Sequence, residues 1–427
     1  MKSYTTSAVF GIARDIPVNY VTRDNVDGAL VNNLTRDKHV VIYGSSKQGK
    51  TCLRKHCLQE EDYITVTCSN RWDLGDLHSS ILKMAGYELE LQKTKTVSGK
   101  QKVSAKFGVS IKAPGIGEIG GELGSVNDDG KSSTVTSSNL ELDVYDANDI
   151  INALKVIEFV QYIVLEDFHY LPNDVQKDFA IALKAFHESS ELCFIIVGVW
   201  LEENRLIQFN GDLTGRVIAI NADKWSDEDL REVVGNGEKL LNVTFDGAFI
   251  KDLISGSFES VAIVQEACHN ACIRHDINHT QKTLTKVGNG LDARTLIQEV
   301  VNAQSGRYFG FITHFASGFQ ETRLEMHNWI LYPVLIATPQ ELEEGLRLTS
   351  LNKTIKDKHP GDKWNPGNLT QALQSTASLQ VKKGTVPIIL DYDQTKTNLN
   401  VVDRGFLIWL EYQEREELLS QNELPIQ

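Results

Sequence analysis

Continuous apolar runs in the first half of the chain predict buried strands. The clearest runs are residues 39–43 (HVVIY), 162–165 (YIVL) and 193–200 (CFIIVGVW). Runs of this length are typical of strands covered on both faces, as in a parallel sheet. Residues 51–58 and 175–187 carry a helical pattern between them. We therefore expect an α/β domain with helices on both faces of a parallel sheet.

The apolar positions after Trp225 follow a helical spacing instead. Residues 229–234, 249–254 and 261–273 place apolar side chains three and four positions apart, which predicts short amphipathic helices. We expect these helices to form a small helical unit beside the sheet.

The remainder of the chain predicts helices followed by a β-hairpin. A polar stretch at 278–289 is interpreted as a linker. The elements expected beyond it are helices at 293–301, 323–329, 339–354 and 369–379, then strands at 386–390 and 399–403. Such an order looks like a winged helix, whose helix before the hairpin commonly reads DNA. Here that helix contains no lysine or arginine. A protein contact is therefore favoured, and DNA contact through the neighbouring lysines is the alternative.

A long insertion interrupts the α/β pattern. Residues 94–138 are rich in Gly, Ser, Lys and Thr, and within them 107–111 and 115–121 alternate small and apolar positions. Alternation bounded by glycine predicts a β-hairpin or a flap rather than packed core. A contact with a partner or subunit and a plain surface loop are both open interpretations.

Composition narrows the class of protein. The chain has 427 residues with 43 basic and 57 acidic side chains, a net charge of -14, which argues against a general polyanion binder. The longest apolar run, 193–200, is far shorter than the roughly 20 residues of a membrane span. The N-terminus shows no secretory signal pattern, and the six cysteines are sparse. We therefore expect a cytoplasmic protein with reduced thiols and no membrane contact.

The strongest motif is G-x-x-x-x-G-K-[ST] at residues 44–51, between the predicted strand 39–43 and a predicted helix. Its glycines let backbone N–H groups point inward around phosphates, and the helix N-terminus adds positive charge. Lys50 is expected to reach the terminal phosphates, and the Thr51 hydroxyl is a natural Mg²⁺ ligand. The predicted nucleotide-binding residues of this stretch are Gly44, Ser45, Ser46, Lys47, Gln48, Gly49, Lys50, Thr51 and Cys52.

Two carboxylates end the apolar run at 162–165. The C-terminal end of a parallel strand is where such sheets bind ligands, so Glu166 and Asp167 are expected to complete the metal site with Thr51. In the usual order Asp precedes Glu. The reversed order assigns Glu166 to the magnesium and Asp167 to the attacking water, and the shorter Asp predicts slow hydrolysis.

An arginine follows the third apolar run. Arg216 lies in the stretch LTGR, about where a loop arginine offsets charge on a transferred phosphate, in the same chain or from a neighbouring subunit. A surface arginine is the equally weighted alternative.

Together these motifs resemble those of the AAA+ and STAND ATPases, most closely prokaryotic members with an origin-recognition-like layout. The resemblance covers about residues 10–280 and includes residues 20–27 (YVTRDNVD), which are similar to the family opening that lies against adenine. It implies ATP and Mg²⁺ as cofactors and adds Tyr20, Val21 and Arg23 to the nucleotide site. It also implies a helical lid over the nucleotide, although its second sensor arginine is not evident here.

The expected organisation follows from this resemblance. We expect a P-loop ATPase domain at 1–222 with the insertion at 94–138, a helical lid at 223–280, and a winged-helix-like domain at 290–415. The preferred function is an ATP-binding and ATP-hydrolysing switch that assembles with itself or a partner effector, with prokaryotic anti-phage defence as a setting by analogy. The alternatives are a DNA-associated loader or regulator and a scaffold that binds ATP with scarcely any turnover.

Overall fold

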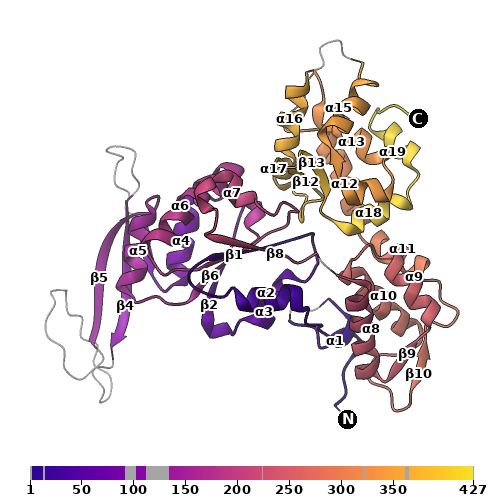
Figure 1. The fold of residues 1–427 in the computed structure, drawn as a ribbon, viewed down its shortest axis with the longest axis horizontal. Helices are drawn as coiled ribbons and strands as arrows, with labels where there is room; N and C mark the ends of the chain where they lie inside the picture. Colours follow the sequence, from indigo (N-terminus) through magenta and orange to yellow (C-terminus); the bar gives the residue numbers. More distant parts are fainter. Residues whose placement is uncertain are drawn as a thin grey trace.

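A computed structural model of the protein describes residues 2–12, 15–91, 102–111, 134–223, 225–320, 323–360 and 365–426. Its central sheet is parallel throughout and has the strand order β2-β6-β7-β1-β8 (Figure 1). The strands are β1 (His39–Tyr43), β2 (Tyr63–Thr67), β6 (Tyr162–Glu166), β7 (Phe194–Val197) and β8 (Val217–Asn221). The predicted parallel sheet is therefore confirmed.

Helices cover both faces of this sheet because strands such as β1 are buried and apolar on both sides. Val41 and Tyr43 of β1 pack against α4, α5 and α6, whereas Val40 and Ile42 pack against α2 and α3. The helices of this part are α2 (Ala29–Asn32), α3 (Lys50–Cys57), α4 (Leu74–Met84), α5 (Ala147–Val156), α6 (Asn173–Ser189) and α7 (Arg205–Phe209). We call these strands and helices the sheet body.

A second, antiparallel sheet extends from the sheet body (Figure 1). It consists of β3 (Glu88–Leu91), β4 (Lys102–Ile111) and β5 (Thr134–Asp143), and β4 pairs with β5 from Lys102–Asp143 to Ile111–Thr134. Of the insertion at 94–138, residues 102–111 and 134–138 lie in this pair. The rest of it, including 115–121, lies outside the described residues.

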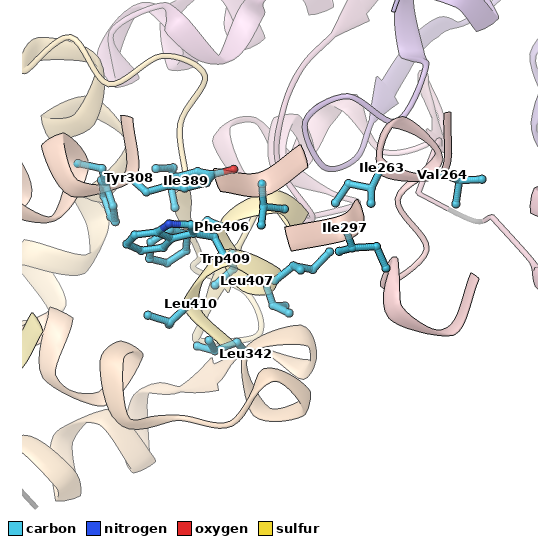
Figure 2. Packing of buried hydrophobic residues seen from close by; sticks show 14 of the residues in the cluster. Ile263, Val264, Ile297, Tyr308, Leu342, Ile389, Phe406, Leu407, Trp409 and Leu410 are labelled. Carbon is cyan, nitrogen blue, oxygen red and sulfur yellow. The ribbon is translucent and has the colours of Figure 1, made fainter. Parts of the chain in front are cut away.

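The remaining elements share one large hydrophobic core. It begins with α1 (Thr6–Phe10), where the ring of Phe10 meets Phe245 edge-on at 5.8 Å, and continues to Leu424. Figure 2 shows Ile263 and Val264 of α10, Ile297 of α11 and the residues of α18 in this core. We call these elements the capping body, because they hold both the expected lid and the expected winged-helix-like domain.

The capping body contains helices and two small sheets. Its first elements are α1, α8 (Asp227–Leu241), β9 (Val243–Phe245), α9 (Gly247–Gly256), α10 (Val261–Arg274) and β10 (Thr285–Val287). The later helices are α11 (Ala293–Asn302), α12 (Ser305–Ala316), α13 (Met326–Ile336), α14 (Pro339–Glu344), α15 (Leu348–Lys356), α16 (Pro366–Gln374), α17 (Thr376–Lys382), α18 (Arg404–Glu411) and α19 (Arg415–Gln421). The second sheet consists of β11 (Leu346–Arg347), β12 (Leu390–Asp393) and β13 (Asn398–Val401) in the order β11-β13-β12.

Several predicted elements in the capping body have different limits in the structure. The helix expected at 339–354 is two helices, because Gly345 adopts a left-handed φ of 81° and β11 follows it. The helix expected at 369–379 is also divided, into α16 and α17. The strand expected at 386–390 begins only at Leu390, and Pro387 has no N–H to donate to the sheet. The stretch at 278–289 is more than a linker, because it contains β10.

Within the described residues, no helix is both long and apolar enough to cross a membrane.

Candidate nucleotide site

The phosphate loop connects the buried strand β1 to helix α3. Gly44 and Gly49 have positive φ angles of 144° and 81°, and the α3 helix begins directly at Lys50. A side chain at either glycine would strain the backbone, and a Cβ at Gly44 would lie 2.7 Å from Oδ1 of Asp223. The sequence pattern therefore produces the tight strand–loop–helix turn that a phosphate site requires.

Asp223 holds the start of this loop and was not expected from the sequence. Its Oδ1 accepts the backbone N–H of Ser45 at 2.5 Å, and its Oδ2 accepts the Ser45 hydroxyl at 2.6 Å. Asp223 follows β8, the parallel neighbour of β1, so both strands deliver these residues to the same edge of the sheet. The carboxylate is a second anchor for the loop in addition to α3.

The side chain of Lys50 reaches back to the first residues of the loop. Its Nζ donates to the carbonyl oxygens of Gly44, at 3.0 Å, and Ser45, at 2.5 Å. The side chain is buried, and this burial lowers the pKa of Lys50 to about 8 although three nearby carboxylates act in the opposite direction. These carboxylates are Asp223, Glu166 and Asp167. The loop lysine and the predicted acidic pair therefore belong to one electrostatic cluster.

The acidic pair stands at the C-terminal end of β6, as the sequence predicted. Oε1 of Glu166 accepts Nε–H of Arg54 at 2.8 Å, and both side chains are largely buried. Arg54 lies on α3, one turn after Lys50, so the helix that supports the phosphate loop also positions Glu166. Asp167 has a left-handed φ of 56°. Burial raises the pKa of Asp167, the neighbouring Glu166 raises it further, and Lys50 opposes both effects.

A cavity of about 310 Å³ joins these groups to the N-terminal segment and the capping body. The acidic pair and the predicted residues from Ser46 to Cys52 line it, as do Tyr20, Val21 and Arg23. Ser45 lies behind the loop on Asp223. This size is at the lower end of the range of small-molecule sites. Stretches more than 100 positions apart in the chain therefore meet at one cavity.

The residues carried over from the family opening line the cavity beside the N-terminal segment, a part that we call its N-terminal end. The Tyr20 hydroxyl donates to Oδ1 of Asp27 at 2.6 Å, and burial raises the pKa of Tyr20. The guanidinium of Arg23 lies 3.8 Å from the Trp225 ring centroid and donates to the Ala222 carbonyl oxygen at 3.0 Å. Ala222 and Trp225 belong to the segment that leads into the capping body. Arg23 therefore holds this segment against the wall of the cavity.

An amide pair at the same end was also missed. Nδ2 of Asn19 donates to Oε1 of Gln265 at 2.9 Å, and Nε2 of Gln265 donates back to Oδ1 of Asn19 at 3.1 Å. The Val233 carbonyl accepts the second hydrogen of Asn19, which fixes the orientation of both amides. Both residues line the cavity. No local pattern distinguishes a buried Asn or Gln of this kind from a surface one.

Arg216 lies away from the phosphate loop of its own chain. It immediately precedes β8, and its carbonyl accepts the N–H of His39, the first residue of β1. The phosphate loop follows the opposite end of β1, about 17 Å away at roughly 3.3 Å per residue. Nη2 of Arg216 donates to Glu188 at 2.7 Å, and Nη1 donates to the Asp212 carbonyl. This position does not suit a role for Arg216 at the phosphates of its own chain. The two other interpretations, a role at the site of a neighbouring subunit and a plain surface arginine, stay open.

Comparison with known proteins finds structural neighbours only. No family model matches the chain, and no curated protein matches it. Solved structures that resemble it include ORC1 of Aeropyrum pernix in complex with DNA, at 10% identity and a TM-score of 0.45, covering 99% of this chain and 97% of that one. A Walker-type ATPase of Pyrococcus abyssi has 11% identity and a TM-score of 0.48 over 94% and 99%. RuvB of Thermotoga maritima has 10% identity and a TM-score of 0.37 over 96% and 97%.

The class of fold follows from the chain's own topology. The phosphate loop follows β1, β7 separates β1 from β6, and the acidic pair ends β6. The chain has the fold of the AAA+ P-loop ATPases, which confirms the predicted fold class. At 10–11% identity and TM-scores below 0.5, these neighbours add nothing to the topology and nothing about individual residues.

Proposed function

We propose that the protein is an ATP-dependent molecular switch that binds and hydrolyses MgATP. One contact carries the proposal: the backbone N–H of Ser46, in the phosphate loop, donates to the carbonyl oxygen of Val402 in the capping body at 2.8 Å. In this kind of site the backbone amides of the loop donate hydrogen bonds to phosphate oxygens. The terminal phosphate of a bound triphosphate and the docked capping body would therefore compete for this one donor.

The capping body is suited to respond as a unit. Its continuous core joins α10 and α11 to α18 (Figure 2), so the expected lid and the C-terminal helices move together. Beyond the loop it docks on the sheet body through an apolar cluster of Val199, Val381, Ile388 and Val402 and the buried ion pair of Arg205 with Asp391. The Thr395 hydroxyl also donates to Oε1 of Glu202 at 2.9 Å. Contacts between two packed bodies are ones that a bound ligand can rearrange.

The metal site fits magnesium. Thr51, Glu166 and Asp167 supply hydroxyl and carboxylate oxygens, the donors that Mg²⁺ prefers, at the cavity that also holds Lys50. A bound Mg²⁺ would supply charge neutralisation between phosphate oxygens. The side chains of the protein hold the nucleotide and orient the reacting groups. Lys50 would contact the phosphates, and Arg54 positions Glu166 for the metal ion. Asp167 would orient the attacking water.

Assembly and setting extend the proposal. Arg216, which faces away from its own loop, would serve the nucleotide of a neighbouring subunit, so turnover would depend on association. Self-assembly or capture of a separate effector protein, in prokaryotic anti-phage defence by analogy, would be the output of the switch.

The DNA-loader alternative requires release of the capping body. Ala377 and Val381 of α17, the helix before the β12–β13 hairpin, pack toward Val199, Tyr170 and Leu201 of the sheet body. A duplex could reach this face only after undocking. ATPase assays with and without duplex DNA, over a salt series, separate the two: steep salt-sensitive stimulation favours the loader.

Small-angle X-ray scattering tests the switch directly. Saturating MgATPγS is expected to increase the radius of gyration relative to ADP, because the triphosphate displaces Val402 from Ser46. Lys50→Ala should show no difference between the two nucleotides. Identical scattering of the wild type with both, at demonstrated saturation, would contradict the proposal.

A further inference from the structure

Two cations converge at the tip of the phosphate loop, one from each body. Nζ of Lys47 and Nη1 of Arg307 each donate to Oε1 of Gln304 at 3.0 Å. They therefore lie at most about 6 Å apart on a single neutral oxygen. Lys47 is in the loop, whereas Gln304 and Arg307 stand at the start of α12 in the capping body.

Asp403 is the carboxylate that contacts Arg307. It accepts a hydrogen bond from Nη2 of Arg307, and its Oδ1 also caps α18 by accepting the backbone N–H groups of Gly405 and Phe406. The cap ties Asp403 to the start of its helix. A second carboxylate, Glu266, also acts electrostatically on Lys47.

Arg307 also has a donor that is unused within the described part of the chain. There its buried Nε has no hydrogen-bond partner. Its Nη2 is 3.5 Å from the carbonyl oxygen of Pro387, which lines the nucleotide cavity. Burial lowers the pKa of Lys47, Asp403 and Glu266 raise it, and Arg307 lowers it. An anion placed at the loop tip would satisfy both cations together.

We infer that Arg307, together with Lys47, distinguishes a nucleoside triphosphate from a diphosphate. This inference rests on the proposed function and deepens it. Ser46, whose amide meets Val402, and Lys47 are neighbours in the loop, so an added phosphate group at this tip reaches both. Arg307 then exchanges part of its contact with Asp403 for the phosphate, and the discriminating group lies on the capping body itself.

The test compares the affinities of MgATPγS and ADP by calorimetry. Arg307→Ala should weaken MgATPγS binding by about tenfold, the usual effect of removing a charged hydrogen bond, and leave ADP affinity within about twofold. Arg274→Ala is the matched control, because Arg274 forms an exposed ion pair with Glu299 in the same body. It should change neither affinity.

A second substitution keeps the inference testable if Arg307→Ala does not fold. Lys47 has a left-handed φ of 62°, which Asn tolerates, so Lys47→Asn removes the charge without straining the loop. Lys47→Asn should also lower the preference for MgATPγS over ADP. Arg307→Lys should restore part of the preference that is lost in Arg307→Ala.

Two results would overturn the inference. Equal weakening of both nucleotides, or no change in either, in Arg307→Ala and Lys47→Asn removes the discriminating role while leaving the proposed function intact. A wild-type protein that binds neither nucleotide overturns both.

Discussion

Arg205 and Asp391 form a buried ion pair across the two bodies, with Nη1 of Arg205 3.2 and 2.9 Å from the two carboxylate oxygens of Asp391. Arg205 begins α7 in the sheet body, and Asp391 lies on β12 in the capping body. The pair joins the capping body to the sheet body at a contact separate from the phosphate loop.

Arg205→Ala should therefore destabilise the docked form. Removal of one partner leaves the buried Asp391 charge uncompensated, which costs about 3 kcal/mol in the free energy of unfolding. Urea titration measures this, and the exposed pair provides the control, since Arg274→Ala should cost less than about 1 kcal/mol. A loss for Arg205→Ala no larger than the control would show that the pair does not hold the bodies together.

Lys50→Ala should abolish nucleotide binding. The variant removes the ammonium group that faces the phosphates and leaves the loop glycines in place. Titration with a fluorescent ATP analogue measures the effect, and Lys55→Ala, on the same helix, should bind as the wild type does. Retained ATP affinity in Lys50→Ala would refute the assigned site.

Asp167→Asn should bind MgATP normally and hydrolyse it at least 100-fold more slowly, roughly the contribution of a general base. Single-turnover assays separate the chemical step from product release. Unchanged turnover would remove Asp167 from the mechanism and leave Glu166 as the candidate.

Nucleotide affinity should fall above about pH 8. The pKa of Lys50 is lowered to about 8 by burial, whereas an unfolded lysine titrates near 10.5. A phosphate favours the charged form, so binding above pH 8 takes up a proton and weakens by up to about tenfold per pH unit. Calorimetry in buffers of different ionisation enthalpy measures the uptake.

The stability of the nucleotide-free protein should move in the opposite direction. Between about pH 8 and 10 the unfolded chain binds the Lys50 proton more tightly than the folded one, so the free energy of unfolding rises with pH. This rise should be smaller in Lys50→Ala. A same-sized rise in both proteins would assign it to other groups.

Arg216→Ala tests assembly. Because Arg216 lies at the opposite edge of the sheet from its own loop, the variant should bind ATP normally in dilute solution. Its turnover should lose any dependence on protein concentration, which sedimentation and activity measured over the same range would detect. Wild-type turnover independent of concentration would leave Arg216 as a surface residue.

Local patterns predicted strands β1, β6 and β7 and the phosphate loop because each is encoded by contiguous residues, whereas β2 and β8 were not predicted. The run His39–Tyr43 is buried on both faces, and its loop needs glycine at positions of positive φ. Helix α12 was missed because Gly306 and Gly310 interrupt its pattern, and the burial of Tyr308, Phe311 and Phe315 in the core stabilises it instead.

The rest of the candidate site depends on contacts across the fold. Asp223 meets Ser45, Val402 meets Ser46, and Arg307 approaches Lys47 only when β1, β8 and the capping body are assembled. Side chains of these types are ordinary on a surface, and no spacing in the chain marks them. Their partners are set by topology.

The chain crosses between the two bodies in two places, from α1 to β1 and from β8 to α8, and both crossings border the N-terminal end of the cavity. The Asn19–Gln265 amide pair joins the two bodies at the same end. A rotation of the capping body would therefore pivot about this end, and the part of the capping body at the phosphate loop would travel furthest. Such a protein could open and close around one retained nucleotide, so that the conformational cycle and the exchange of nucleotide with solvent would be separate events.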